Sequence, residues 1–318
     1  MSEPVRLLAI PISGRQTASS RLRLYSLLDG LPDRFATTAL RPRDDADLHR
    51  HDPAQFDLVY VQKEAGASVV EFCRRAVGGG VPVIYDIDDD FGCWPGMAEA
   101  AMCDLATTVT VDSAARAMEV RDGTRGNPVV LPCMIDAAAD PGRAVRPFRQ
   151  RISTVASFGN ALSLRHTLPY LAAVPPEFDT YVVGPADAGD ELPGTRLVAF
   201  RRDTFVADLT AADVFVLAHG EREAPLKDNN RLVMAMSLGL PSLVSPSPAY
   251  LEVLDDIGLR WLACRPDEIR PRLAALAAPA VRDEIGRAGY AYAWANYSPQ
   301  RCVARFTDVL DASLAPTR

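Results

Sequence analysis

The sequence has few histidines and cysteines, and none of them shows the spacing of a common metal site. The six cysteines are scattered along the chain and include no Cys-x-x-Cys pair. The four histidines do not cluster either; they are His49, His51, His166 and His219. Because paired cysteines are missing, we expect a reduced, cytoplasmic setting in which most cysteines serve as small core residues.

Long apolar segments and an excess of basic charge are also missing. No uninterrupted apolar run is long enough to cross a bilayer, and the N-terminus lacks the basic and apolar segments of a signal peptide. The formal net charge of -7 argues weakly against a nucleic-acid backbone as the main partner, although it does not exclude a local basic face. The chain also lacks a Gly-x-Ser-x-Gly nucleophile elbow.

The 318 residues do contain a regular alternation of short apolar runs with helical segments. This alternation, repeated in two halves, predicts two doubly wound α/β domains with a cleft between them. We expect the domains to cover residues 1–140 and 151–296, joined by a linker at 137–150. The expected strands are residues 5–12, 37–41, 56–61, 81–85, 107–111 and 129–132 in the first half, and 152–158, 178–183, 195–200, 214–217 and 242–245 in the second.

One strand–loop–helix segment in the second half suggests an anion site. The apolar run Val214–Leu217 predicts a buried strand, and a helix is expected over Asp228–Leu238 with Gly239 at its C-terminal end. Lys227 and Arg231 lie four residues apart, which would place them on one face at the helix N-terminus. Such a pair suits a diphosphate, because a helix N-terminus adds free N–H groups and partial positive charge. The alternative is that both are solvated surface charges.

Two loops that follow predicted strands could also approach a ligand. Arg21 and Arg23 open a helix after a polar loop behind the first strand, where phosphate or an acceptor could bind. Gly159 and Asn160 follow the strand expected at 152–158, and a glycine there permits a close backbone approach. Both loops could equally be ordinary strand–helix turns.

Asp86–Asp90 form an acidic run after the strand expected at 81–85. Such a run can hold Mn²⁺ or Mg²⁺ against a diphosphate. It can also cap the next helix and make turns.

Taken in order, these motifs resemble those of GT-B glycosyltransferases, in particular the retaining family-4-like group. The resemblance rests on Ser20-Arg21-x-Arg23, Tyr85-Asp86-x-Asp88-Asp89, the segment Val130–Asp136 (with Cys133 in place of the usual Asn), Ala212-Asp213-Val214, Lys227 and Gly239-Leu240-Pro241. It implies a GT-B fold in which the C-terminal segment, residues 297–318, crosses back to the first domain. It also implies metal-independent, retaining transfer of a sugar from a UDP- or GDP-sugar to a glycan, natural-product or protein acceptor, with no cofactor.

The resemblance also implies roles for particular residues. The expected donor-binding residues are Gly159, Asn160, Lys227, Asn230, Arg231, Ser247 and Tyr250. Arg21 and Arg23 are expected on the acceptor side or in the cleft, and Asp88 and Lys227 are expected to take part in catalysis. In a retaining reaction the leaving phosphate can take the acceptor proton, so no dedicated protein base is required.

One departure from the family pattern keeps two alternatives open. Many members carry two glutamates eight residues apart, whereas this chain has Met234 at the second position and Leu226 near the first. One alternative is a metal-dependent GT-A-type glycosyltransferase that uses Asp86–Asp90. The other is a non-catalytic nucleotide-sugar-binding protein of GT-B fold.

Overall fold

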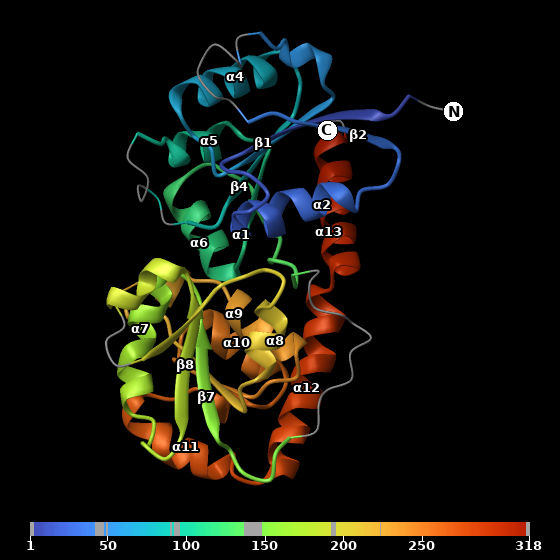
Figure 1. Ribbon diagram of the computed structural model, residues 1–318. Helices are drawn as coiled ribbons and strands as arrows, with labels where there is room; N and C mark the ends of the chain where they lie inside the picture. Colours follow the sequence, from blue (N-terminus) through green and yellow to red (C-terminus); the bar gives the residue numbers. More distant parts are fainter. Residues whose placement is uncertain are drawn as a thin grey trace. The chain divides into compact units, whose positions relative to one another are not determined.

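The computed structural model describes residues 3–41, 48, 50–89, 91, 96–136, 148–191, 195–222 and 224–315 (Figure 1). The chain divides into two compact units. Unit 1 comprises residues 1–134 and 299–318, and unit 2 comprises residues 135–298. Most of the expected linker, residues 137–147, lies outside the described part. No helix among the described residues is both long and apolar enough to span a membrane.

Unit 1 is built on a parallel sheet in the strand order β2-β1-β3-β4-β5-β6. Its strands are short apolar runs, and every residue of β3 and β4 is buried, as expected for a parallel sheet covered on both faces. The strands are β1 (Val5–Pro11), β2 (Phe35–Ala39), β3 (Leu58–Gln62), β4 (Val83–Ile87), β5 (Thr108–Val111) and β6 (Pro128–Val130).

The helices of unit 1 include one from the far end of the chain. They are α1 (Ala18–Ser20), α2 (Ser26–Asp29), α4 (Ala67–Gly78), α5 (Glu99–Leu105), α6 (Ala114–Gly123) and α13 (Pro299–Leu314). Figure 1 shows α13, in red, beside α2. The apolar stripe of α13 includes Phe306, whose ring packs edge-on against Tyr60 of β3 at 5.1 Å between centroids.

The helix expected near Ser20 is present but not regular. Between α1 and α2 the backbone forms a π-helical turn over Arg21–Tyr25. π turns are uncommon and occur often near functional sites. Here the turn carries both Arg21 and Arg23, and both side chains are buried.

Unit 2 has its own parallel sheet, in the order β11-β10-β7-β8-β9. Its strands are β7 (Thr154–Phe158), β8 (Asp179–Gly184), β9 (Arg196–Ala199), β10 (Val214–Leu217) and β11 (Ser242–Val244). Its helices are α7 (Ala161–Ala172), α8 (Phe205–Thr210), α9 (Asn230–Ser237), α10 (Pro248–Asp256), α11 (Ile269–Ala275) and α12 (Pro279–Tyr297).

Helices α9 and α12 pack closely because glycine lines their contact. A Cβ atom added at Gly286 of α12 would lie 2.5 Å from the backbone oxygen of Gly239, just beyond α9. Gly239 itself has φ 69 and ends α9 in the left-handed conformation, as the sequence predicted.

Each sheet has a point where the strand order reverses. In unit 1 the chain leaves β1 for β2 on one side and then returns to β3 on the other. In unit 2 the reversal lies between β7 and β10. Ligands of open α/β sheets bind outside the carboxyl ends of the strands at such points.

Candidate functional site

Arg231 of α9 lies at the reversal point of unit 2. Its guanidinium donates to the carbonyl of Ala218, directly after β10, at 2.5 Å, and to the carbonyl of Phe158, at the end of β7, at 3.5 Å. Within the described part of the chain, no carboxylate forms an ion pair with it. A guanidinium has five N–H donors, so these two carbonyls leave N–H groups available for the oxygens of a ligand.

Gly159 brings the loop after β7 against Arg231. Its φ of 154 is a conformation that residues with a side chain rarely adopt. A Cβ atom there would also lie 3.0 Å from the Cβ of Ser163 and 3.4 Å from the Cδ of Arg231. The backbone conformation and the close approach of Ser163 therefore both favour glycine here, and Arg231 packs directly against it.

Asn160, the next residue, caps α7. Its side-chain oxygen accepts a hydrogen bond from the Ser163 N–H at 2.8 Å. The side chain is exposed. Asn160 therefore helps to begin α7 at the same edge of the sheet as Arg231.

Lys227 is not on a helix face shared with Arg231, and this corrects the sequence prediction. Helix α9 begins at Asn230, so Lys227 lies in the loop between a 3₁₀ turn at Ala224–Leu226 and the helix. The helix starts late because the Asp228 side chain accepts a hydrogen bond from the Asn230 N–H, a turn that favours a non-helical backbone.

Lys227 nevertheless belongs to the same region. It is half-buried, and its charge is close enough to His219 to lower the pKa of that imidazole. Lys227 and Arg231 therefore both bring positive charge close to His219, at the carboxyl edge of the sheet.

His219, directly after Ala218, was not singled out by the sequence. Its Nδ1 lies 3.0 Å from the Ser247 hydroxyl oxygen, and its ring stacks on Tyr250 with 4.2 Å between centroids. Burial, followed by the charges of Arg231 and Lys227, lowers the pKa of His219 to about 2, so the imidazole is neutral at physiological pH. The signal available in the sequence was its place directly after a buried strand.

Ser247 and Tyr250 are both buried, in line with their place behind β11. Ser247 is the residue before α10, and Tyr250 lies in the first turn of that helix. The Tyr250 hydroxyl is buried without a hydrogen bond. Burial raises its pKa to about 12, against a smaller opposite effect of Arg231.

Met234 occupies the position where the resembling glycosyltransferases carry the second glutamate. It lies on α9 and is only 6% exposed within the core of unit 2. The contact that a carboxylate would supply there is therefore missing.

In unit 1, Arg23 and Asp86 form a buried, two-pronged ion pair. Nε and Nη2 of Arg23 lie 3.0 and 2.6 Å from the two carboxylate oxygens, and the side chains are 1% and 0% exposed. Although burial acts to lower it, the pKa of Arg23 is raised well above its usual value by the Asp86 carboxylate. Thr110 donates to the same carboxylate at 2.7 Å. The Arg23 guanidinium is thus buried and paired with Asp86 inside unit 1. We had expected it to face a cleft.

Arg21 is buried as well and donates to the carbonyl of Gln16 at 3.2 Å. Its guanidinium therefore also makes contacts inside unit 1. The acceptor role assigned to these two arginines stays a prediction.

Lys63 is the residue of unit 1 that sequence analysis missed. It follows β3 at the reversal point and is buried, with its Nζ 2.5 Å from Asp88 and 2.9 Å from Asp89. Its φ of 61 is left-handed, which is uncommon for a residue other than glycine. Backbone strain of this kind is found most often at functional sites.

The acidic run is therefore largely neutralised by protein cations. Asp86 pairs with Arg23, and Asp88 and Asp89 pair with Lys63. The described residues also include no group of three or more histidine, cysteine or acidic side chains arranged to hold a metal ion. Asp90 lies outside the described residues. The described part of the run therefore does not fit a site for Mn²⁺ or Mg²⁺.

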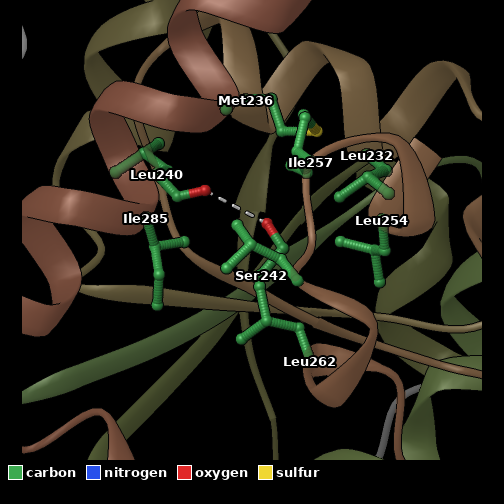
Figure 2. A pocket seen from close by; sticks show the side chains of 10 residues that line it. Leu232, Met236, Leu240, Ser242, Leu254, Ile257, Leu262 and Ile285 are labelled. Carbon is green, nitrogen blue, oxygen red and sulfur yellow. Dashed lines mark hydrogen bonds between the residues drawn. The ribbon is translucent and has the colours of Figure 1, made fainter.

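A small cavity in unit 2 is part of the core and not of this site. Figure 2 shows its lining, which is almost entirely aliphatic and comes from α9, α10, α12, β11 and the segments that follow α9 and α10. Its one hydroxyl, that of Ser242, donates to the carbonyl of Leu240 at 3.3 Å. It has room for about one water molecule at most and carries no charged group, so it does not suit a nucleotide.

Comparison with known proteins identifies the fold. No family model matches the chain, and no curated protein does. Among solved structures, a mutant O-GlcNAc transferase of Thermobaculum terrenum aligns with 98% of this chain and 68% of its own, at 12% identity and a TM-score of 0.62. The α,α-trehalose 6-phosphate synthase of Burkholderia multivorans aligns over 98% and 99% of the two chains, at 12% identity and a TM-score of 0.56.

The T4 phage BGT, solved in complex with its UDP-glucose substrate, aligns over 98% of this chain and 100% of its own, at 9% identity and a TM-score of 0.61. With two parallel-sheet, Rossmann-like domains, the chain therefore has the GT-B fold of these glycosyltransferases, as predicted. A GT-A-type enzyme, which lacks the second such domain, is not compatible with it.

Proposed function

We propose that this protein is a glycosyltransferase that takes a sugar from a nucleotide-sugar donor. The observation that carries the proposal is the position of Arg231. Its guanidinium lies at the reversal point of the unit 2 sheet, against Gly159 and in the same region as Lys227, and no described carboxylate pairs with it. A diphosphate is the ligand that such a cationic pair suits best.

The structural relatives support this assignment through their ligands. One of them is described with UDP-glucose as its substrate, and another, an α-glucosyltransferase, is described in complex with UDP and DNA. We infer a UDP- or GDP-sugar as donor for this chain. Gly159, Asn160, Asn230, Ser247 and Tyr250 complete the proposed donor region.

We propose that the reaction is metal-independent and retaining. The anomeric carbon loses its bond to the diphosphate, and the bonding electrons leave with the diphosphate. The acceptor oxygen bonds to that carbon, and its proton passes to an oxygen of the leaving phosphate. Arg231 and Lys227 stabilise the charge that develops on the leaving group, which is the task that a divalent ion performs in other transferases.

We assign the acceptor to unit 1, with Asp88 contacting an acceptor hydroxyl. Asp88 lies just beyond β4, and Lys63 holds its carboxylate. Arg21 and Arg23 would then support this region from the π turn, with Arg23 acting through Asp86. A glycan, a natural product or a protein could supply the hydroxyl.

Met234 favours a second candidate, a nucleotide-sugar-binding protein without turnover. A buried methionine stands where the resembling enzymes carry a carboxylate, so one donor contact is lost. Binding by Arg231 and Lys227 does not depend on that carboxylate. The two candidates therefore differ in turnover and not in binding.

The experiment that tests the proposal combines binding with turnover. Thermal melts with UDP, GDP and their sugar conjugates should show one nucleotide class that stabilises the protein, by about 2.7 kcal/mol at 100 times its dissociation constant. Release of the nucleoside diphosphate should then be measured with a panel of hydroxyl acceptors. Stabilisation with release supports the transferase, stabilisation without release supports the binding protein, and no stabilisation by any nucleotide contradicts both.

A further inference from the structure

His219 is held by three separate contacts at the reversal point of unit 2, one through its backbone and two through its ring. Its backbone N–H donates to the Ser245 hydroxyl at 3.0 Å, its Nδ1 lies 3.0 Å from the Ser247 hydroxyl, and its face stacks on Tyr250 with 24° between the ring planes. Tyr250 is fully buried. A side chain fixed in this way has little rotational freedom left to lose when it binds a ligand.

The ring also lies beside the proposed diphosphate site. His219 directly follows Ala218, whose carbonyl accepts the hydrogen bond from Arg231. Arg231, Lys227 and His166 are the positive or titratable groups that act on the imidazole. Because of its burial, and to a smaller extent because of these groups, the ring does not take up a proton at physiological pH, so it would serve as a neutral hydrogen-bonding group and not as a base.

The contact with Ser247 indicates which ring nitrogen carries the proton. Ser247 precedes α10, so Nδ1 points at the N-terminal end of a nine-residue helix. The partial positive charge there favours a lone pair on Nδ1 over an N–H. We infer that the Ser247 hydroxyl donates to Nδ1, which places the proton on Nε2.

We propose that His219 is a specificity-determining residue that donates a hydrogen bond from Nε2 to an oxygen of the bound nucleotide sugar, with Ser247 and Tyr250 as its positioning residues. The oxygen belongs to the diphosphate or to the sugar, and both present the same acceptor chemistry. The Tyr250 ring stacks on the His219 imidazole, and the buried Tyr250 hydroxyl is close to Arg231, so His219, Tyr250 and Arg231 lie together at this subsite. The inference rests on the proposed function, because it takes a nucleotide sugar as the ligand.

The first test reads the ring directly in the protein without ligand. ¹⁵N-histidine NMR at pH 6 to 8 should show His219 as a neutral imidazole with the proton on Nε2, and Ser247→Ala should shift the tautomer ratio. A protonated ring in this range, or a proton on Nδ1 that Ser247→Ala leaves in place, would overturn the assignment. This measurement does not depend on any nucleotide.

The second test measures affinity by calorimetry with UDP and UDP-glucose, and with GDP and GDP-mannose as the alternative pair. His219→Ala should weaken binding at least tenfold, and His219→Gln, which keeps an N–H donor, should recover part of the loss. Weakening of both the diphosphate and its sugar conjugate assigns the hydrogen bond to phosphate, and weakening of the conjugate alone assigns it to the sugar.

Two further outcomes separate this inference from the proposed function. Wild-type protein that binds none of the four ligands would overturn the proposed function. Wild-type binding that persists unchanged in folded His219→Ala would overturn only the role of His219. His51→Ala, a change in unit 1, serves as the matched histidine control and should leave affinity unchanged.

Discussion

Lys63 and Asp88 form an ion pair at the reversal point of unit 1, with 2.5 Å between Nζ and Oδ1. The side chains are 9% and 10% exposed, and the Lys63 backbone is left-handed. Strain of this kind costs about 1–3 kcal/mol. The pair therefore persists because the surrounding contacts, including the Lys63 N–H donating to the Asp86 carbonyl at 2.8 Å, hold the residue in place.

Replacing Lys63 should destabilise the protein. Lys63→Met leaves the Asp88 and Asp89 carboxylates without their shared cation, and we expect a loss of about 2–4 kcal/mol in the free energy of unfolding. Lys63→Gly should lose about 1 kcal/mol less, because glycine accepts a positive φ. Urea unfolding measures both. Arg121→Met, an exposed change on α6, is the control; a Lys63→Met variant as stable as that control would contradict the account.

Chelation should leave the protein unaffected. Arg23 and Lys63 already pair with the carboxylates of Asp86, Asp88 and Asp89, so a divalent ion would have to displace two protein cations. Nucleotide binding and turnover should be the same with EDTA as with added Mn²⁺. Saturable stabilisation by Mn²⁺ that disappears in Asp88→Asn would reverse this conclusion.

Gly286→Ala should destabilise unit 2 although alanine favours a helix. The added methyl would lie 2.5 Å from the Gly239 oxygen, and such overpacking costs about 1–3 kcal/mol beyond the gain of about 1 kcal/mol in helix propensity. Glu284→Ala, exposed on the same helix, should change stability by less than about 0.5 kcal/mol. Thermal melts of the two variants decide the point, and equal melting temperatures would refute the tight contact.

Stability should fall in mild acid because of His219. Its pKa is about 2 in the folded protein and about 6.5 in the unfolded chain, so below pH 6.5 the unfolded state binds more protons and gains stability. Between pH 7.5 and pH 5 this linkage removes about 1–2 kcal/mol from the free energy of unfolding, at about 1.4 kcal/mol per pH unit. His219→Gln should show a flatter dependence over that range; an identical slope in wild type and variant would show that His219 does not contribute.

Much of the fold follows from local patterns in the sequence. The apolar runs Val214–Leu217 and Ser242–Val244 form strands within the ranges that the sequence predicted. In both cases hydrophobic periodicity and flanking prolines or glycines decide the structure locally. Gly239 was also predicted correctly. It ends α9 in the left-handed conformation, which glycine adopts more readily than other residues.

The contacts of charged side chains could not be predicted in the same way. Arg23 pairs with Asp86, a residue 63 positions away, and that contact depends on strands β1 and β4 lying on either side of β3. Lys63 and His219 were missed for a similar reason, since their partners come from other elements. The late start of α9 depends on one local hydrogen bond of Asp228, which the helix pattern does not reveal.

The central claim is that Arg231 and Lys227 bind the diphosphate of a nucleotide sugar, and calorimetric titration with UDP and GDP tests it most directly. Each charge-assisted hydrogen bond contributes about 1.5–3 kcal/mol. Arg231→Ala and Lys227→Ala should therefore weaken binding of the preferred nucleotide by about ten- to a hundredfold. Arg231→Lys should weaken it too, because an ammonium cannot reproduce the guanidinium fork.

Arg270→Ala, an exposed change on α11, is the control and should bind as the wild type does. Arg231→Ala also leaves the Ala218 and Phe158 carbonyls without their donor, so melts must accompany each titration to show that the variant is folded. The account predicts a tenfold or greater loss of affinity in folded Arg231→Lys and Lys227→Ala. Folded variants that bind the nucleotide as tightly as Arg270→Ala would contradict it.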